Sequence, residues 1–296
     1  FNGISGGDFA AAIAAGNPVI AKGHPCHPET TRILGDAALT AIRETGMPEA
    51  LVQLIYRTSH EDGAKLVSDH RIGASGYTGA RHTGLKLKAA ADAAGKPMYL
   101  ELSSINPVFY LAGSLKERAT ALADEFVGSC LMGTGQFCTN PGLVIVPAGE
   151  IGNAFVAAVA ERFGKASVGT MLAEGVRTSF STGVRTLINA GASLVVGGEP
   201  GGGNGICFQN TLLTVSARQF LTNPAVFQTE AFGNGSLIVL AESTAQMTEI
   251  AESLEGNLTG AIYSDTKGTD DADYGTIEKP LRTKVGRLLN DKMPTG

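Results

Sequence analysis

The sequence lacks long apolar runs, a basic stripe and a signal for secretion. No run of about 18 apolar residues occurs in the 296 residues, which argues against a transmembrane helix. The chain does not open on a charged segment followed by an apolar one, so we see no secretion signal. The net charge of −5 is mildly acidic, and Lys and Arg form no stripe. We therefore expect neither nucleic acid nor a membrane as a partner.

Cysteine is scarce as well. Four cysteines in a chain this long do not make a disulfide framework, and reduced thiols in a cytoplasmic enzyme fit better. His24, Cys26 and His27 are close in sequence, but no second Cys/His pair completes a tetrahedral site, so we expect no metal. The initiator Met is also absent, and the chain stops straight after an apolar stretch. We expect a fragment or a trimmed chain.

The patterns that are present alternate between strands and helices. Helices are expected over 9–15, 28–45, 61–68 and 79–94, and strands over 18–21, 51–55, 72–77 and 97–100. This alternation predicts an α/β fold whose parallel sheet is covered on both faces, most simply a doubly wound one.

A second unit is expected after residues 101–104. A long helix over 115–132 leads to a glycine-rich turn, and a strand over 143–146 and a helix over 151–163 follow. The glycines from 197 to 203 lack the spacing of a phosphate-binding loop and indicate a surface loop. We predict two domains, 1–103 for a dinucleotide and 104–296 for catalysis.

Cys138 is the strongest candidate for chemistry. An isolated cysteine is most often a small buried apolar residue. Here it stands in the turn Gly133-Thr134-Gly135-Gln136-Phe137-Cys138, where glycines allow a close backbone approach and N–H groups can face an oxyanion. A thiolate is a strong nucleophile, so the turn favours a reactive cysteine.

Several polar residues follow strands, where open α/β sheets bind their ligands. Glu101 ends the strand 97–100 and, if desolvated, could serve as a general base; a solvated strand end or a helix cap is the alternative. Lys22 is either an exposed lysine or a cation for a ribose or phosphate. Thr78-Gly79-Ala80 follows a strand and opens a helix containing Gly84, a weak signal for an anion site.

Together these segments resemble the aldehyde dehydrogenase superfamily over essentially the whole chain. The resemblance rests on five motifs in order, which are Val19-Ile20-Ala21-Lys22, Tyr77-Thr78-Gly79-Ala80, Tyr99-Leu100-Glu101-Leu102-Ser103-Ser104, Gly135-Gln136-Phe137-Cys138-Thr139 and Glu230-Ala231-Phe232-Gly233. It implies an aldehyde-dehydrogenase fold in which Cys138 is the nucleophile and Glu101 the base. Lys22, His24, Thr78, Gly79, Ala80 and Gly84 would bind the cofactor, together with Glu230 and Phe232 at the nicotinamide end.

The cofactor and the substrate follow from finer details of the likeness. Lys22-Gly23-His24 replaces a Lys-Pro-Ser-Glu that is common in NAD-preferring members, and the lost acidic group leaves room for a 2′-phosphate. The resemblance therefore implies NADP, with NAD possible. The segments 101–107 and 135–142 look most like α-ketoglutarate semialdehyde dehydrogenases, with long-chain aldehyde dehydrogenases as the alternative. A small-molecule aldehyde is the implied substrate.

Some features depart from the family pattern. Its oxyanion-hole asparagine would precede Phe1, Asn234 stands where Pro is usual, and residues 290–293 replace a more apolar stretch before Pro294. The C-terminal tail and the oligomerisation strands are missing, although the resemblance implies a homodimer or homotetramer. A cofactor-independent thiol hydrolase and a non-catalytic nucleotide-binding remnant are the rival hypotheses. The absence of a motif suited to a Cys–His pair weighs against the hydrolase.

Overall fold

The chain divides into two compact units, one up to Leu102 and one from Ser103 onward. The structure is a computed structural model that describes residues 2–295. The division lies beside the boundary expected at 103/104, and the roles assigned to the two parts stay predictions. None of the described helices is long and apolar enough to cross a membrane.

The first unit alternates short strands with helices. Its elements are η1 (Asn2–Ile4), α1 (Gly7–Ala14), β1 (Val19–Lys22), α2 (Pro28–Glu44), η2 (Glu49–Leu51), β2 (Val52–Ile55), α3 (His60–Ser68), β3 (Ser75–Thr78), α4 (Arg81–Ala93) and β4 (Met98–Glu101). Pro at the start of α2 and the Ser59 hydroxyl that caps α3 account for two of the helix starts.

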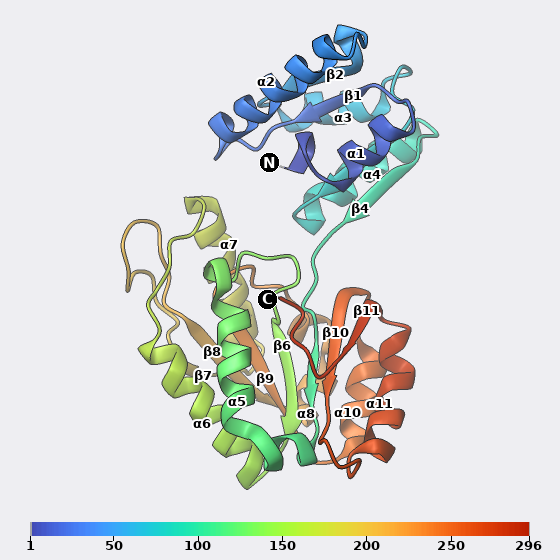
Figure 1. Ribbon diagram of the computed structural model, residues 1–296. Coiled ribbons are helices and arrows are strands. Elements are labelled where there is room, and N and C mark those ends of the chain that lie inside the picture. Colours follow the sequence, from blue (N-terminus) through green and yellow to red (C-terminus); the bar gives the residue numbers. More distant parts are fainter. Residues whose placement is uncertain (1, 296) are drawn as a thin grey trace. The chain divides into compact units, whose positions relative to one another are not determined.

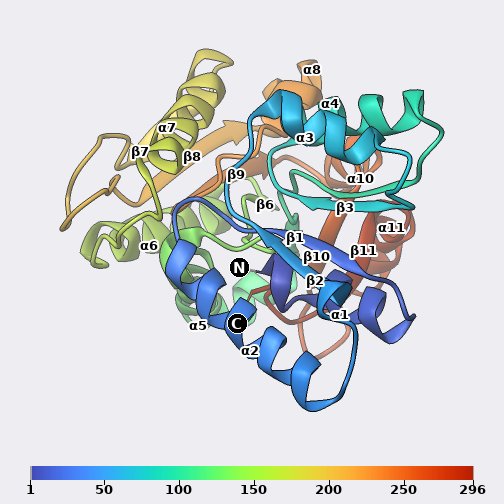
Figure 2. The same ribbon diagram turned by 90° about the horizontal axis from the view of Figure 1, so that it is seen from above.

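The strands of this unit form two separate parallel pairs, β1 with β2 and β3 with β4, which lie apart in Figures 1 and 2. The predicted parallel pairing is confirmed, whereas the four strands form two sheets and not the single sheet predicted. The strands are only four residues long, and η1 and α1 both pack against β1. The strand expected over 72–77 begins later, at Ser75, because the carbonyl oxygen of Asp69 accepts from the Ile72 N–H and closes a turn there.

The second unit is a three-layered α/β/α structure. Its elements are β5 (Val108–Tyr110), α5 (Ala112–Leu131), η3 (Met132–Gly135), β6 (Leu143–Pro147), α6 (Glu150–Lys165), α7 (Glu174–Asn189), β7 (Ser193–Val196), β8 (Thr211–Ser216), α8 (Ala217–Thr222), α9 (Pro224–Phe227), β9 (Gly235–Ala241), α10 (Thr244–Ser253), β10 (Asn257–Tyr263), α11 (Asp271–Arg282) and β11 (Val285–Asn290). The glycines at 197–203 lie in the connection between β7 and β8, as expected.

One seven-stranded sheet runs through this unit in the order β11-β10-β5-β6-β9-β8-β7 (Figure 1). Neighbouring strands are parallel except for β7 and β8. Along β6, Leu143 and Ile145 pack into the cluster that includes α7, α8, α10 and α11, whereas Val144 and Val146 pack into the cluster of α5 and α6. Both faces are therefore buried, which is why this strand is apolar throughout.

The helix expected over 115–132 is longer than predicted and is interrupted. In α5 the backbone of Arg118 leaves the helical region, with φ −149° and ψ 32°. Its guanidinium reaches Asp291 and the Ser264 carbonyl. The expectation of one continuous helix is wrong at this residue, whose side chain is held by the segments that follow β10 and β11.

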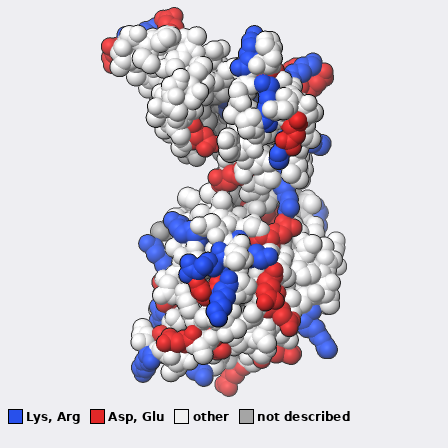
Figure 3. Space-filling model, turned by 90° about the vertical axis from the view of Figure 1, so that its right-hand side faces the viewer, with Lys and Arg blue, Asp and Glu red and all other residues white. Residues whose placement is uncertain are grey.

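Charged side chains of both signs are interspersed on the face shown in Figure 3. Many pair within one helix at a spacing of three or four residues, for example Arg32 with Asp36 and Lys165 with Glu161. Such exposed pairs each contribute little, about 0.3–0.5 kcal/mol.

Candidate active site

Cys138 lies in the connection from η3 to β6, on the second unit. Its side chain is exposed and takes part in no disulfide, so the thiol is not confined to apolar packing. Cys130, on α5, is fully buried, and desolvation raises the pKa of its thiol to about 12. Cys138 is therefore the thiol of this region that can meet a dissolved electrophile.

The turn before Cys138 has a left-handed backbone. Gly133, Thr134 and Gly135 have φ values of 55°, 59° and 66°. A Cβ atom on Gly135 would lie 2.0 Å from the carbonyl oxygen of Gly233, so only glycine permits this approach. The cysteine loop is thus pressed against the backbone of the Glu230–Gly233 motif, a contact that the sequence alone did not predict.

Side chains of the same loop form hydrogen bonds with three other segments of the chain. Asn140 Nδ2 donates to the Gly233 carbonyl at 3.0 Å, and Gln136 Oε1 accepts from the Leu172 N–H at 2.8 Å. The hydroxyl of Thr139, next to the thiol, lies 2.7 Å from that of Thr295. The loop therefore joins α5, the Glu230 motif and the end of the described chain.

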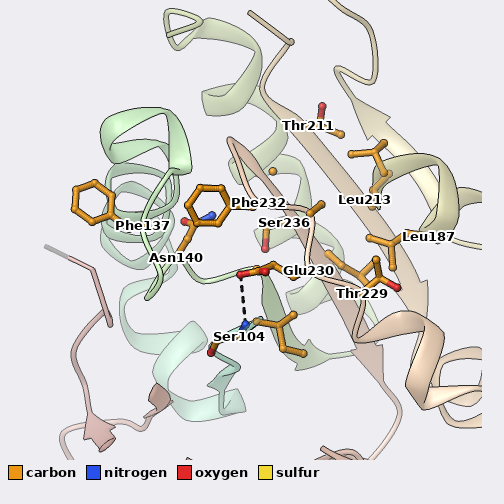
Figure 4. A pocket seen from close by; sticks show the side chains of 16 residues that line it. Ser104, Phe137, Asn140, Leu187, Thr211, Leu213, Thr229, Glu230, Phe232 and Ser236 are labelled. Carbon is orange, nitrogen blue, oxygen red and sulfur yellow. Dashed lines mark hydrogen bonds between the residues drawn. The ribbon is translucent and has the colours of Figure 1, made fainter. Parts of the chain in front are cut away.

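A pocket opens beside this loop (Figure 4). Glu230, Phe232, Phe137 and Asn140 line it with the starts of β8 and β9. Glu230 Oε1 accepts from the Ser104 N–H at 3.3 Å, drawn as the dashed line in Figure 4. Desolvation raises the pKa of the Glu230 carboxyl, and hydrogen bonds from Ser104 and Ser103 act against that rise.

Glu101 lies at the carboxyl end of β4, in the first unit, where it is partly exposed. It pairs in register with Thr78 of β3, and its carbonyl oxygen accepts from the Gly79 N–H at 3.1 Å. The structure thus brings Glu101 together with the Thr78-Gly79-Ala80 turn. Cys138 belongs to the other unit, and its pairing with Glu101 stays a prediction.

The residues expected to hold a dinucleotide occupy two places in the first unit. The helix α4 starts at Arg81 without a side-chain cap and without an acidic residue in its first turn, so its N-terminal N–H groups can bind an anion. Gly84 is buried within α4, where a Cβ atom would lie 2.5 Å from a methyl group of Leu102. Gly84 therefore allows close packing of α4 against Leu102, and an anion site at the start of α4 stays a prediction.

Lys22 and His24 are exposed at the end of β1. The rings of His24 and His27 stack at 5.0 Å, and His24 Nδ1 accepts from the Cys26 N–H at 3.2 Å. This bond leaves Nε2–H as the donor of a neutral ring. Burial, then His27 and Lys22, lower the pKa of His24. Within residues 2–295 no group of three or more His, Cys, Asp or Glu side chains could hold a metal ion.

Two residues of this region were not singled out from the sequence, Asn106 and Asn140. Both are buried, and both bind the backbone of the loop or of its neighbours. Their partners are far away in the chain, and the only signal was their place inside two of the quoted segments, 101–107 and 135–142.

The fold and the site together define an α/β protein with a mainly parallel sheet and an exposed thiol on a glycine turn. The sequence model of the Aldehyde dehydrogenase family matches residues 3–272, and the chain belongs to this family. The fold class expected from the sequence and the resemblance to this family are thereby confirmed.

Two relatives extend over nearly the whole chain. It is 36% identical to "Alpha-ketoglutaric semialdehyde dehydrogenase 2" of Azospirillum brasilense, covering 99% of this chain and 56% of that protein. It is 31% identical to "Alpha-ketoglutaric semialdehyde dehydrogenase" of Acinetobacter baylyi, covering 99% and 55%. The chain therefore spans about half the length of these relatives.

Solved structures show the same fold. Betaine aldehyde dehydrogenase from Staphylococcus aureus, in complex with NAD+, superposes with a TM-score of 0.81 at 20% identity, covering 96% of this chain and 57% of that one. Glyceraldehyde-3-phosphate dehydrogenase GapN from Methanocaldococcus jannaschii, complexed with NADP, gives 0.79 at 20% identity, covering 98% and 61%.

Proposed function

We propose that the protein carrying this chain oxidises an aldehyde to a carboxylic acid with NADP or NAD, using Cys138 as the nucleophile. The observation that carries the proposal is the exposed Cys138 thiol on a loop whose backbone is pressed against the Glu230–Gly233 motif. An exposed thiol, two of whose loop neighbours line a pocket, can attack a carbonyl carbon, which a buried thiol such as Cys130 cannot.

The reaction would proceed through Cys138 in three stages. The thiolate adds to the aldehyde carbon and forms a thiohemiacetal, whose oxyanion the Cys138 N–H can stabilise; one such donor typically contributes about 10²–10³ in rate. When bound, the dinucleotide supplies the acceptor for the hydride that leaves this carbon. Cys138 then holds a thioester, and Glu101 takes a proton from the water that hydrolyses it, releasing the acid and the free thiol.

The residues present fit a dinucleotide on chemical grounds. The uncapped N-terminus of α4 suits the pyrophosphate, and Lys22 at the end of β1 suits the adenosine side. Glu230 and Phe232 line the pocket beside the cysteine loop, in keeping with a role at the nicotinamide end. We propose NADP over NAD because Gly23-His24 offers no acidic side chain at this position, and the Nε2–H of His24 can donate to a phosphate.

The proposed substrate is α-ketoglutarate semialdehyde. This choice is supported by the two relatives that carry this activity in their names, at 36% and 31% identity. Other aldehydes, long-chain ones included, are the competing substrates. Comparing kcat/KM over a panel of aldehydes with each cofactor decides among them.

Replacing Cys138 tests the nucleophile. We expect Cys138→Ala to abolish NADPH formation from aldehyde while NADP still binds. The thiohemiacetal that gives up the hydride forms only on the Cys138 thiol. The matched control is Cys26→Ser, which removes the other exposed thiol and should leave turnover within about twofold of the parent, since no catalytic contact is lost. Turnover that survives in Cys138→Ala contradicts the proposal.

Replacing Glu101 tests the base. In Glu101→Gln the carboxylate can no longer accept a proton from water, so we expect the thioester on Cys138 to accumulate. Mass spectrometry of the intact protein after one turnover should show the added mass of the acyl group, and a digest should locate it on the peptide containing Cys138. Steady turnover at the parental rate without that adduct would remove Glu101 from the mechanism.

A further inference from the structure

The side chain of Asn106 binds the backbone of the cysteine loop at two residues, Cys138 and Asn140. It lies just before β5 and is fully buried. Its Nδ2 atom donates one hydrogen bond to the carbonyl oxygen of Cys138 and another to that of Asn140, each at 2.9 Å. The amide of Asn106 thus binds the carbonyl oxygens of the two residues that flank Thr139.

The amide of Asn106 can adopt only one orientation here. Its Oδ1 atom accepts from the hydroxyls of Ser104 and Thr259, both at 2.9 Å, and from the Thr259 N–H at 3.3 Å. A backbone N–H can only donate and a carbonyl oxygen can only accept, so exchanging the oxygen and nitrogen would break the bonds on both sides. No other side chain of this size supplies both functions.

The backbone of Asn106 is fixed as well. Its φ of 46° is in the left-handed region, which asparagine and aspartate tolerate better than most residues. Asn257 Oδ1 accepts from the N–H groups of Ile105 and Asn106, at 2.8 and 3.2 Å. The side chain is therefore held rigidly beneath the loop that it binds.

We propose that Asn106 is a positioning residue for Cys138, setting the direction of its thiol by fixing the loop backbone through the Cys138 and Asn140 carbonyls. The proposal rests on the proposed function. The Asn140 side chain extends the arrangement by donating to the Gly233 carbonyl. The thiol is thereby held at a fixed position relative to the motif that contains Glu230 and Phe232. A displacement of about 1 Å in such a group can lower a rate by about 100-fold.

Two substitutions at Asn106 and one control test the proposal. Asn106→Asp keeps the size, the left-handed backbone and one acceptor oxygen, but replaces both donated bonds by repulsion from the two carbonyl oxygens. Asn106→Gly removes the side chain, adopts the same φ freely and adds no charge. The control is Asn210→Asp. Asn210 is also buried, and its Nδ2 donates to the carbonyls of Phe163 and Ala166 and not to the cysteine loop. Aspartate keeps the oxygen that accepts from Asn234 Nδ2, so the contact nearest to the loop is retained.

Steady-state kinetics give the first readout. We expect both Asn106 variants to lower kcat by about 10–100-fold while the aldehyde KM changes less than about threefold, because positioning acts on the chemical step. Asn210→Asp should lower the Tm as much as Asn106→Asp and keep kcat within about twofold. Parental kcat in the Asn106 variants, or an equal loss in Asn210→Asp, overturns the proposal.

Thiol reactivity separates this proposal from the proposed function. Iodoacetamide labelling of the native protein, followed on the peptide containing Cys138, needs no cofactor or aldehyde. We expect the Asn106 variants to change that rate by about fivefold or more and Asn210→Asp to leave it alone. Unchanged labelling overturns the positioning role even where turnover is seen. A parent that oxidises no aldehyde ends the proposed function, and the labelling result then stands alone as the test of Asn106.

Discussion

Cys130 and Cys138 lie on either side of the end of α5 and differ in their chemistry. Cys130 is packed among the apolar residues of α5 and α6, and its pKa is raised to about 12. Cys138 is exposed on a loop whose glycines bring backbone groups close. The same residue type is thus inert in one setting and available in the other, and the difference comes from burial and backbone shape.

The stability of the folded chain should depend on pH through the buried carboxyl group of Glu230. Its pKa is raised by burial, so the stability that the neutral form contributes is present below the ordinary value of 4.5 and is lost as the pH rises through the raised value. We expect Glu230→Gln, which stays neutral, to melt at a higher temperature than the parent at pH 8, with the gap closing below about pH 4. Thermal unfolding across this pH range measures the difference.

The exposed Glu249 of α10 provides the control for that measurement. Glu249→Gln should show no gap that depends on pH in this way. If Glu230→Gln is instead less stable at every pH, the hydrogen bond from the Ser104 N–H outweighs desolvation of the carboxylate.

At the residue scale, the sequence indicated candidates that lie within short local motifs and missed residues whose partners are distant in the chain. Cys138 could be singled out because its turn is rich in glycine and polar residues. Asn106 could not, because its partners Asn140 and Thr259 are brought to it only by the order of β5, β6 and β10 in the sheet. An asparagine before a proline looks the same in any loop.

At the scale of elements, the interruption of α5 joins three parts of the second unit. Arg118 donates to the Ser264 carbonyl after β10, pairs with Asp291 after β11, and lies over the ring of Tyr263 at 5.8 Å. Asp291 itself has a φ of 50°. The segment that continues to Thr295, and so to Thr139 beside the thiol, is anchored at its start by this pair.

A double-mutant cycle measures the anchor. The Arg118 and Asp291 side chains are each 29% exposed, so we expect a coupling of about 1 kcal/mol in the free energy of unfolding, between the values typical of surface and buried pairs. Arg118→Met, Asp291→Asn and the double variant are compared by urea unfolding. The more exposed pair Arg32 and Asp36 on α2 serves as a reference and should couple by less than about 0.5 kcal/mol.

Elements with a local signal were predicted well and their pairing was not. The start of α2 at Pro28 was predicted, because proline is favoured at the first position of a helix. The order of the seven strands depends on contacts between segments far apart, and buried apolar strands such as β6 and β9 resemble each other in sequence. The separation of β1–β2 from β3–β4 was missed for the same reason.

At the scale of the whole molecule, the two units differ in how much core they contain. Among residues 2–102 the buried apolar side chains are those of Ile4, Ala21, Ile42 and Ala91. The second unit has two extended clusters, one on each face of its sheet. Since burial of apolar surface is the main stabilising contribution, the first unit has much less to stabilise it.

We therefore expect the first unit of this 296-residue chain to open before the second. Hydrogen exchange followed by mass spectrometry should show fast exchange in α2 and α4 while β6 and β9 remain protected.

A ligand that binds only the folded form stabilises it by about 2.7 kcal/mol at 100 times its Kd. If Lys22 and the start of α4 hold the adenosine and phosphates, saturating NADP should slow exchange mainly in the first unit. Lys22→Ala should weaken that protection, and equal protection in this variant would show that Lys22 makes no contact with the cofactor.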